Sequence, residues 1–572
     1  MENRWIVQPR GNEDKINFLI NELAIPKIIA SLLVQRGVDT FESARKFFRP
    51  SLSDLYDPYL MKDMDKAVER ILKAVSNEEN ILVYGDYDVD GTTSVSMMYL
   101  FLSSFYSNVS YYIPDRYNEG YGISIEGVDY ASDNNFSLII SLDCGVKANM
   151  QVDYAKEKKI DFIICDHHLP GEELPKAVAL LDPQRLDCKY PYKYLSGCGV
   201  GFKLIQALAP EFNIAQEDVF LYLDLVAVSI AADIVPVTDE NKTMAHFGIQ
   251  KLRTNPRIGL KVMIPEEKKS LLSITDIVFQ IAPKINAAGR IEHATRAVEL
   301  LISNNEMNAR GFIFNINELN TQRKELDSTI TESALKQVVE SGQVENYSTI
   351  VYNPQWHKGV IGIVASRLTE VYYKPTLVLT KGKDNELVAS ARSVKNFDVY
   401  AMIEKCSEYL TKYGGHMFAA GFSLKEENYD DFRIKFENEV KKTITKTQTI
   451  PSIEIDQETE FEELTSKIYR LVNQMEPFGP ENMKPVFLTK NVLFAGNQKL
   501  MGKQNEHLRL QVYKNKTVFD VTAFGMGHLV KKFKKYPFDL VYQLDENHWQ
   551  GKIYYRLMVK DVKFYNDEKE VF

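Results

Sequence analysis

The distribution of apolar and polar positions along this chain predicts a set of buried strands, each followed by acidic residues. Residues 81–84 (ILVY), 138–142 (LIISL) and 162–165 (FIIC) are apolar without alternation. This pattern is typical of parallel strands that are buried on both faces of a sheet. Residues 221–232 (LYLDLVAVSIAA) have the length of a buried helix. Together these segments predict an α/β domain over residues 76–245.

Candidate ligands follow each of these apolar runs. Open α/β sheets bind their ligands beyond the carboxyl ends of the strands, so we expect the side chains after the runs to converge on one rim. These side chains are Asp86, Asp88, Asp90, Asp143, Asp166, His167, His168 and Asp233.

This set of side chains predicts a two-metal hydrolase. Carboxylates with one imidazole suit Mn²⁺ or Mg²⁺, whereas a structural Zn²⁺ site would favour cysteines. Two ions about 3.5 to 4 Å apart can share a carboxylate, lower the pKa of a bound water toward about 7 and stabilise both oxygens of a displacement at phosphorus. The implied reaction is metal-assisted hydrolysis of a phosphoester.

Each motif also has a simpler interpretation. The stretch DYDVDG resembles the start of a calcium loop, but the twelfth position counted from Asp86 is Met97, where that loop needs a glutamate. The DHH triplet on its own could be a solvated turn, and Asp143 or Asp233 could only turn the chain or cap a helix. The joint appearance of the motifs at the ends of apolar runs favours a common site.

The remaining pattern predicts three further sections and a helical start. Residues 1–75 are mostly helical in pattern, and residues 246–344 contain a stretch after Gly311 without Gly or Pro that predicts a long connecting helix. Residues 345–447 predict a second α/β domain, and residues 450–565 predict five strands that suggest a small barrel. The fold class is therefore α/β multidomain, with two α/β domains joined by a long helix and a C-terminal β-barrel.

Composition agrees with a globular protein of several domains. The chain has 572 residues, of which 45% are hydrophobic and 26% charged, and a prior of about 150 residues per domain suggests three or four domains. No apolar run approaches the roughly 20 residues that span a bilayer, and the start of the sequence lacks a signal-peptide core, so we expect a cytoplasmic protein without membrane contact. The five cysteines form no CxxC pair and fit reduced thiols.

The net charge of −9 would disfavour a nucleic-acid partner if it were spread evenly. A local cationic path is sufficient, however, and bound metal ions would invert the field of the acidic site. The candidates for this path are Arg116, Arg290, Arg392 and the basic run 530–535.

Eight motifs together resemble a known family. The first four resemble the DHH phosphoesterase superfamily: YGDYDVDGTTS (84–94), SLDCG (141–145), CDHH (165–168) and AADIVP (231–236). The other four are similar to its RecJ branch, which consists of bacterial single-strand-specific 5′→3′ DNA exonucleases: NAAGRI (286–291), WHKGVIGIVASRL (356–368), SARS (390–393) and GGHMFAAGF (414–422). The resemblance implies that the two α/β domains are of the DHH and DHHA1 types and that the barrel is an OB-like fold that binds single strands.

The resemblance also implies roles for the site residues. Asp143 would bridge two divalent cations, Mn²⁺ or Mg²⁺. The other implied ligands are Asp88 for one ion, and Asp90, His167 and Asp233 for the second. His168 would face the substrate phosphate and stabilise its charge. Where many superfamily members have a histidine ligand this chain has Tyr84, and Asp86 is the implied substitute.

Substrate-binding residues are implied in the same way. They are Arg116, Asn286, Arg290, Ser390, Arg392, Gly415 and His416. The last four would hold the 5′ phosphate or the nucleotide beside the scissile bond, which would explain polarity and the release of mononucleotides. A narrow cleft between the two α/β domains would exclude duplex DNA.

The hypothesis is therefore a metal-dependent 5′→3′ exonuclease of single-stranded DNA that acts in recombination and repair. The resemblance implies single-strand binding protein and a RecQ-type helicase as partners. One alternative is a DHH phosphodiesterase for short oligoribonucleotides or cyclic dinucleotides, whose shorter relatives generally lack the N-terminal section and the barrel. Another is a non-enzymatic replication scaffold with a decayed site, which would lack ligands that this chain retains.

Overall fold

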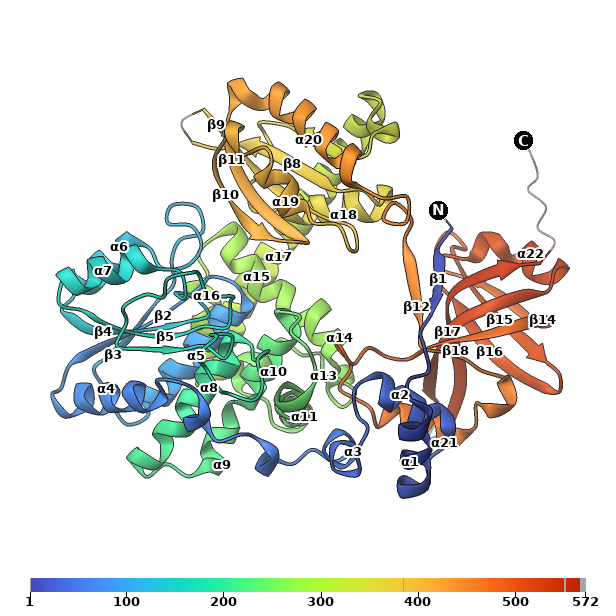
Figure 1. The fold of residues 1–572 in the computed structure, drawn as a ribbon, viewed down its shortest axis with the longest axis horizontal. Helices are drawn as coiled ribbons and strands as arrows, with labels where there is room; N and C mark the ends of the chain where they lie inside the picture. Colours follow the sequence, from blue (N-terminus) through green and yellow to red (C-terminus); the bar gives the residue numbers. More distant parts are fainter. Residues whose placement is uncertain (1, 384, 550–551, 566–572) are drawn as a thin grey trace. The chain divides into compact units, whose positions relative to one another are not determined.

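The computed structural model describes residues 2–383, 385–549 and 552–565. They form two compact units (Figure 1). The small unit contains Asn286–His293 and Phe314–Ile453 together with the first residues of the chain. The large unit contains Trp5–Ile285, Ala294–Ile313 and the segment from Glu454 onward.

The first sheet of the large unit is parallel and carries the predicted strands. Its strand order is β3-β2-β4-β5-β6. The strands are β2 (Asn80–Gly85), β3 (Val109–Tyr112), β4 (Phe136–Leu142), β5 (Asp161–Cys165) and β6 (Ala179–Leu181). In register, Gly85 pairs with Leu142, Leu142 with Cys165, and Cys165 with Leu181. The carboxyl ends of four neighbouring strands are therefore level, and the residue after each of them is an aspartate.

Helices cover both faces of this sheet. The apolar side of α6 (Ile125–Asp133) and α7 (Asn149–Glu157) shares a core with Leu82, Ile139 and Ile164 of the strands. Three helices lie on the other side: α5 (Val89–Ser103), α8 (Gly197–Leu208) and α10 (Leu223–Ala232). They contact one another and are almost entirely buried. Helix α4 (Met64–Ser76) precedes the sheet, and α11 (Asp239–Thr254) packs on α10.

The N-terminal helices share their core with the barrel. Ile16, Leu19 and Ile29 belong to the same buried cluster as Phe487 and Leu510. The helices concerned are α1 (Glu13–Leu23), α2 (Lys27–Gln35) and α3 (Phe41–Phe48). Asn12 caps α1 and Thr40 caps α3 through their side chains, which fixes where both helices begin.

The barrel has the five long strands that the sequence predicts. The order β14-β15-β16-β18-β17 is closed by pairing of β17 with β14. The strands are β14 (Val486–Met501), β15 (His507–Lys514), β16 (Thr517–Ala523), β17 (Phe538–Trp549) and β18 (Lys552–Phe564), with a short strand β13 (Gln457–Glu458) beside β14. Closure removes the exposed edges that an open sheet would leave.

The small unit contains the second α/β fold. Its strand order is β10-β11-β9-β8-β7. The strands are β7 (Thr349–Tyr352), β8 (Thr376–Lys381), β9 (Glu386–Arg392), β10 (Leu410–His416) and β11 (Ala419–Lys425), and the helices are α18 (Ile361–Tyr372), α19 (Val399–Glu404) and α20 (Tyr429–Thr443). In this sheet β7 and β8 run parallel while the other neighbouring strands are antiparallel, so the sheet is mixed.

The predicted connecting helix is α17, Glu306–Glu340, with 35 residues. Shorter elements complete the chain: β1 (Arg4–Val7), α9 (Gln216–Val219), α12 (Ile258–Lys261), α13 (Glu266–Lys269), α14 (Ile274–Asp276), α15 (Ala282–Ile291), α16 (Thr295–Leu301), β12 (Ser452–Ile455), α21 (Ser466–Asn473) and α22 (Val530–Lys535). Within the described ranges no helix combines the length and apolarity that a membrane crossing requires. The predicted fold class, two α/β domains with a long helix and a barrel, is confirmed.

Candidate active site

Backbone hydrogen bonds fix the aspartates that follow the strands. The amide of Asp143 donates to the Cys165 carbonyl at 2.9 Å, and the amide of Asp166 donates to the Leu181 carbonyl at 3.0 Å. The sheet ladder thus continues one residue past β4 and β5. Asp143 has a φ of 61°, in the left-handed region that non-glycine residues seldom adopt. This turns the chain sharply at the rim.

Two glycines let helix N-termini approach these aspartates. A Cβ atom on Gly197, at the start of α8, would lie 2.6 Å from Cβ of Asp143. A Cβ atom on Gly91, in the first turn of α5, would lie 2.3 Å from the Asp86 carbonyl oxygen. Neither position has space for a side chain, so both helices start directly at the strand ends.

Asp90 is held by the N-terminus of α8. Its carboxylate accepts hydrogen bonds from the amides of Gly197 at 2.7 Å and Cys198 at 2.8 Å. The hydroxyl of Ser229 on α10 also donates to it, at 2.7 Å. Helix N-termini stabilise negative charge in this way. Asp88 has a related role as the N-cap of α5, where its Oδ1 accepts from the Gly91 amide at 3.0 Å.

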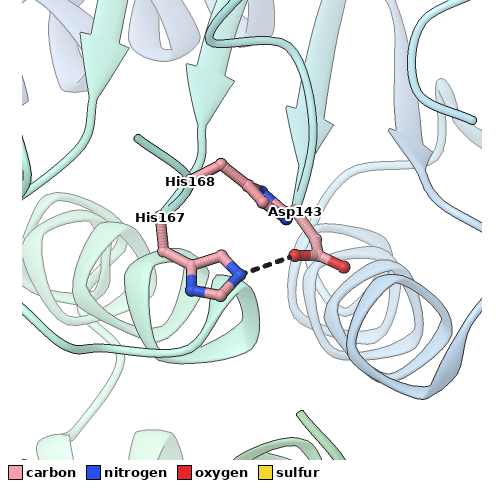
Figure 2. A group of neighbouring side chains, drawn as sticks. All are labelled: Asp143, His167 and His168. Atoms are coloured by element: carbon pink, nitrogen blue, oxygen red, sulfur yellow. Dashed lines mark ion pairs between the residues drawn. The ribbon is translucent and has the colours of Figure 1, made fainter. Parts of the chain in front are cut away.

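The imidazole of His167 lies among three carboxylates. Its Nε2 atom is 3.1 Å from Asp143 Oδ1 (Figure 2). The same atom is 3.6 Å from Asp233 Oδ2 and 3.8 Å from Asp90 Oδ2. Asp143 Oδ1 and His167 Nε2 are buried, and neither has a hydrogen-bond partner among the described residues. Buried polar atoms without partners are costly. Lone pairs that converge in this way fit a cation.

Two groups of side chains could each hold a cation, because in each group one ligand atom per residue lies within 4.8 Å of those of the other two. The first group is Asp143, His167 and His168, and the second is Asp90, His167 and Asp233. Burial is the largest cause that raises the pKa of Asp143 well above its usual range, followed by repulsion from Asp90 and Asp88. Burial, Asp90 and Asp88 likewise raise the pKa of Asp233 to about 8. A divalent cation would remove this repulsion, so the donor set fits Mn²⁺ or Mg²⁺.

Asp86 lies at the same rim but outside both of these groups of described residues. It is fully buried, and its Oδ1 accepts from the Gly122 amide at 3.3 Å, whereas its Oδ2 has no partner among the described residues. Burial and then Asp88 raise its pKa, and the guanidinium of Arg116 lowers it. Arg116 itself stacks on the ring of Tyr87, with Cζ 3.9 Å from the ring centroid. Arg116 therefore brings positive charge to the acidic rim.

His168 is oriented by Asp166. The imidazole Nδ1 is 2.7 Å from Asp166 Oδ1, which also accepts from the His167 amide at 2.8 Å. Burial lowers the pKa of His168, but the hydrogen bond and charge of Asp166 outweigh it and raise that pKa to about 9. The hydrogen bond to Asp166 therefore favours the protonated imidazole. The hydroxyl of Tyr121 lies 3.1 Å from the other ring nitrogen, Nε2.

The remaining candidate residues lie in the small unit. Nη1 of Arg392 donates to the hydroxyl of Ser390 at 3.1 Å. Arg392 on β9 pairs with Ala419 on β11, which pairs with His416 on β10, so the arginine and the histidine occupy one row of the sheet. Gly415 precedes His416 with a φ of 145°.

Arg290 and Asn286 lie on α15. Nη1 of Arg290 donates to the Gly359 carbonyl at 2.9 Å, and Oδ1 of Asn286 is buried without a partner in the described chain. A Cβ atom on Gly362 would lie 3.0 Å from both Arg392 and Ser390. The segment from Gly359 to Gly362 therefore lies beside both arginines.

Four residues at the large unit's rim have roles that the sequence did not indicate. Ser229 donates a hydrogen bond to Asp90, and Gly197 leaves the space that Asp143 occupies. The hydroxyl of Tyr121 contacts the imidazole of His168. Asp182 follows β6 in the same row, and burial raises its pKa to about 7. The only signal for Asp182 was the short apolar run that precedes it, and Tyr121 lies close to the candidate Arg116 in the sequence.

The chain matches three domain families in this order: the DHH family, N-terminal domain, over residues 80–230; the DHHA1 domain over residues 346–442; and the RecJ OB domain over residues 455–561. The single-stranded-DNA-specific exonuclease RecJ of Bacillus subtilis is 37% identical over 98% of this chain and 70% of that protein.

Two solved structures are also similar. RecJ of Thermus thermophilus in complex with Mn²⁺ has a TM-score of 0.84 and 24% identity, over 98% of this chain and 79% of that chain. An exonuclease RecJ bound to manganese has a TM-score of 0.60 and 27% identity, over 69% of this chain and 98% of that chain. The fold and the domain matches define a DHH protein with a DHHA1 domain. The chain belongs to the RecJ family, and the resemblance drawn from its motifs is confirmed.

Proposed function

We propose that this chain is a metal-dependent exonuclease that hydrolyses single-stranded DNA from the 5′ end to 5′-mononucleotides. The observation that carries the proposal is that the buried atoms Asp143 Oδ1 and His167 Nε2, within a rim of carboxylates, accept or donate no hydrogen bond among the described residues. Membership of the RecJ family supports the substrate, because its curated relatives are named as single-stranded-DNA-specific exonucleases.

Two divalent cations, Mn²⁺ or Mg²⁺, are the proposed cofactors. Asp143 would bridge them, and a related RecJ structure is described as bound to manganese. When bound, the ions would supply an activated water and neutralise charge on the phosphate. The proposed ligands besides Asp143 are Asp88 for one ion, Asp90, His167 and Asp233 for the other, and Asp86 as an additional ligand.

The chain's own groups have separate tasks at this rim. Asp166 keeps His168 protonated, so that its imidazolium can donate a hydrogen bond to a phosphate oxygen on which charge develops. The amides of Gly197 and Cys198 hold the carboxylate of Asp90 in one orientation. Fixed donors and ligands of this kind require little rearrangement during the reaction.

The polarity of degradation is attributed to residues that hold the 5′ end of the strand. Arg392 is partly buried, desolvation lowers the pKa of its guanidinium, and an anion beside it would offset the cost. The complete proposed set of substrate-binding residues is Arg116, Asn286, Arg290, Ser390, Arg392, Gly415 and His416. The closed barrel would bind the strand further from its end.

The cell biology follows from the proposed substrate. Because chromosomal DNA is double-stranded, the enzyme would depend on a RecQ-type helicase and on single-strand binding protein, and would act in the cytoplasm in recombination and repair. These partners stay predictions. The alternative substrate, short oligoribonucleotides or cyclic dinucleotides, does not require the barrel that this chain has.

The discriminating experiment offers the purified protein linear single-stranded DNA, circular single-stranded DNA, blunt duplex and a dinucleotide RNA, each with Mn²⁺. The proposal expects mononucleotides from the linear strand only. Cleavage of circular DNA, or equal cleavage of duplex, would contradict it. Hydrolysis of the dinucleotide RNA alone would transfer the same chemistry to the alternative substrate.

A further inference from the structure

The loop Met475–Asn482, which leads into the barrel, contacts the segment that follows the candidate ligand Asp233. The Val237 amide donates a hydrogen bond to the Pro480 carbonyl at 2.8 Å. A Cβ atom on Gly479 would lie 2.3 Å from Cγ2 of Val237. The backbone at Gly479 therefore packs directly against the side chain of Val237, and Val237 is only a few residues beyond Asp233.

One buried side chain on α11, Lys242, holds the loop to that helix, and a second, Asn482, lies in the loop and fixes its internal geometry. Nζ of Lys242 donates to the carbonyls of Met475 at 2.5 Å and Glu476 at 3.1 Å. Nδ2 of Asn482 donates to the carbonyls of Met475 at 3.0 Å and Pro477 at 2.9 Å. Lys242 is 3% exposed and Asn482 is 1% exposed. Burial of a polar group is costly without such partners, so the hydrogen bonds of Lys242 and of Asn482 Nδ2 favour one geometry of the loop.

The segment between Asp233 and this junction is strained. Ile234, a β-branched residue, has a φ of 59° in the left-handed region. Conformations of this kind persist when the surrounding structure fixes both sides. The next fixed point along the chain is the Pro236 carbonyl, which accepts from the Tyr192 hydroxyl at 3.0 Å and from Asn241 Nδ2 at 2.9 Å. The hydrogen bond from the Val237 amide to the Pro480 carbonyl of the loop then fixes the far end of this segment.

A pocket opens beside this junction. Lys242 and Asn482 line a cavity of about 440 Å³ together with Phe47 and Thr238. Beside this pocket the two directional hydrogen bonds of Lys242 help to set the position of the loop.

We propose that Lys242 and Asn482 are positioning residues that hold Asp233 in the metal site through the loop Met475–Asn482. The inference rests on the proposed function, because it takes Asp233 to be a metal ligand. The loop would thereby couple the barrel to the metal site, since a shift of the loop backbone would reach Asp233 through Val237 and the strained Ile234.

The test uses Lys242→Met and Asn482→Ala in the full chain, with three measurements on each: Mn²⁺ binding followed by the electron paramagnetic resonance of the free ion, melting temperature, and affinity for a labelled oligonucleotide in EDTA. Residues that orient metal ligands usually affect metal affinity by about tenfold or more. We expect weaker Mn²⁺ binding of this size in both variants, with unchanged oligonucleotide affinity. Lys242→Arg, for which the cavity provides room, should recover most of the Mn²⁺ affinity.

Thr489→Val is the matched control. The Thr489 hydroxyl is buried in the barrel and bonds the Thr459 carbonyl at 2.8 Å and the Tyr542 hydroxyl at 2.7 Å, away from the loop. It should lower the melting temperature and leave Mn²⁺ affinity as in the wild type. The inference is overturned if Lys242→Met and Asn482→Ala behave in the same way as this control. If the wild-type protein bound no Mn²⁺, the proposed function would be contradicted as well.

Discussion

The Nε2 atom of His167 lies 3.1 Å from Oδ1 of Asp143, and neither buried atom has another hydrogen-bond partner among the described residues. Asp143 follows β4 and His167 lies just beyond β5, so the parallel register of these neighbouring strands creates the pair. In the absence of a cation the pair leaves lone pairs unsatisfied in a site crowded with carboxylates. A bound cation would satisfy both atoms at once.

Asp143→Asn should abolish activity while the fold is retained. Without metal, the amide replaces a carboxyl whose ionised form is disfavoured by burial and then by repulsion from Asp90 and Asp88, so the variant should melt at the same temperature as the wild type or higher in EDTA. Saturating Mn²⁺ should raise the melting temperature of the wild type but not of the variant, because ligands stabilise the state that binds them. Asp153→Asn, on an exposed position of α7, is the control and should respond to Mn²⁺ as the wild type does.

The stability of the metal-free protein should fall as pH rises from about 5 to 8. Burial, and then Asp90 and Asp88, raise the pKa of Asp233 to about 8, while an unfolded aspartate titrates near about 3.9. The folded state therefore binds the proton of Asp233 more tightly than the unfolded state does. The stability that this proton contributes is present at low pH and is lost as pH rises through about 8. Melting temperatures in EDTA should decline less steeply in Asp233→Asn than in the wild type. Identical slopes would show that Asp233 does not titrate in this way.

Asp166→Asn should move the alkaline limb of activity to lower pH. Although burial lowers the pKa of His168, Asp166 raises it to about 9, so the imidazole stays protonated below that pH. Without the Asp166 carboxylate, burial still lowers the pKa of His168 and only the charges of Asp233 and Asp90 still raise it, so the protonated form is lost at lower pH. We expect the ratio of the kcat/KM of Asp166→Asn to that of the wild type, measured from pH 6 to 9.5, to be lowest near pH 8. An alkaline limb at the same pH in both proteins would contradict the proposed role of His168.

Gly197→Ala should damage the site more than Gly199→Ala on the same helix. The new methyl group would lie 2.6 Å from Cβ of Asp143, whereas at Gly199 the nearest atom would be 3.4 Å away. Overpacking of this kind costs typically about 1 to 3 kcal/mol, and here the most direct relief is a shift of Asp143. We expect a large loss of kcat and weaker Mn²⁺ binding for Gly197→Ala only. Equal activities of the two variants would show that the contact is unimportant.

The sequence was most informative where a local pattern determines the structure. The apolar runs before Asp86 and Asp143 identified strands, and because parallel strands end at one edge, the convergence of the aspartates could be predicted. Asp182 was missed because its strand, β6, has only three residues and gives a weak periodic signal. The family motifs, rather than periodicity, supplied the individual roles of His167 and His168.

Contacts between distant segments could not be predicted. Ser229 reaches Asp90 only because α10 packs against α5, and no local pattern specifies which helices meet. The N-terminal helices had an amphipathic pattern without an identifiable partner, and the structure shows that Leu19 and its neighbours share a core with the barrel. The long helix α17 and the five barrel strands were predictable, because length and alternation are properties of the segment itself.

The central claim is tested most directly by degrading single-stranded DNA labelled at either end in the presence of Mn²⁺, with EDTA and the Asp143→Asn protein as controls. The account predicts that the 5′ label appears at once as a mononucleotide, that the 3′-labelled strand shortens gradually, and that both controls abolish the reaction. Immediate release of the 3′ label, or degradation that persists in Asp143→Asn, would contradict it.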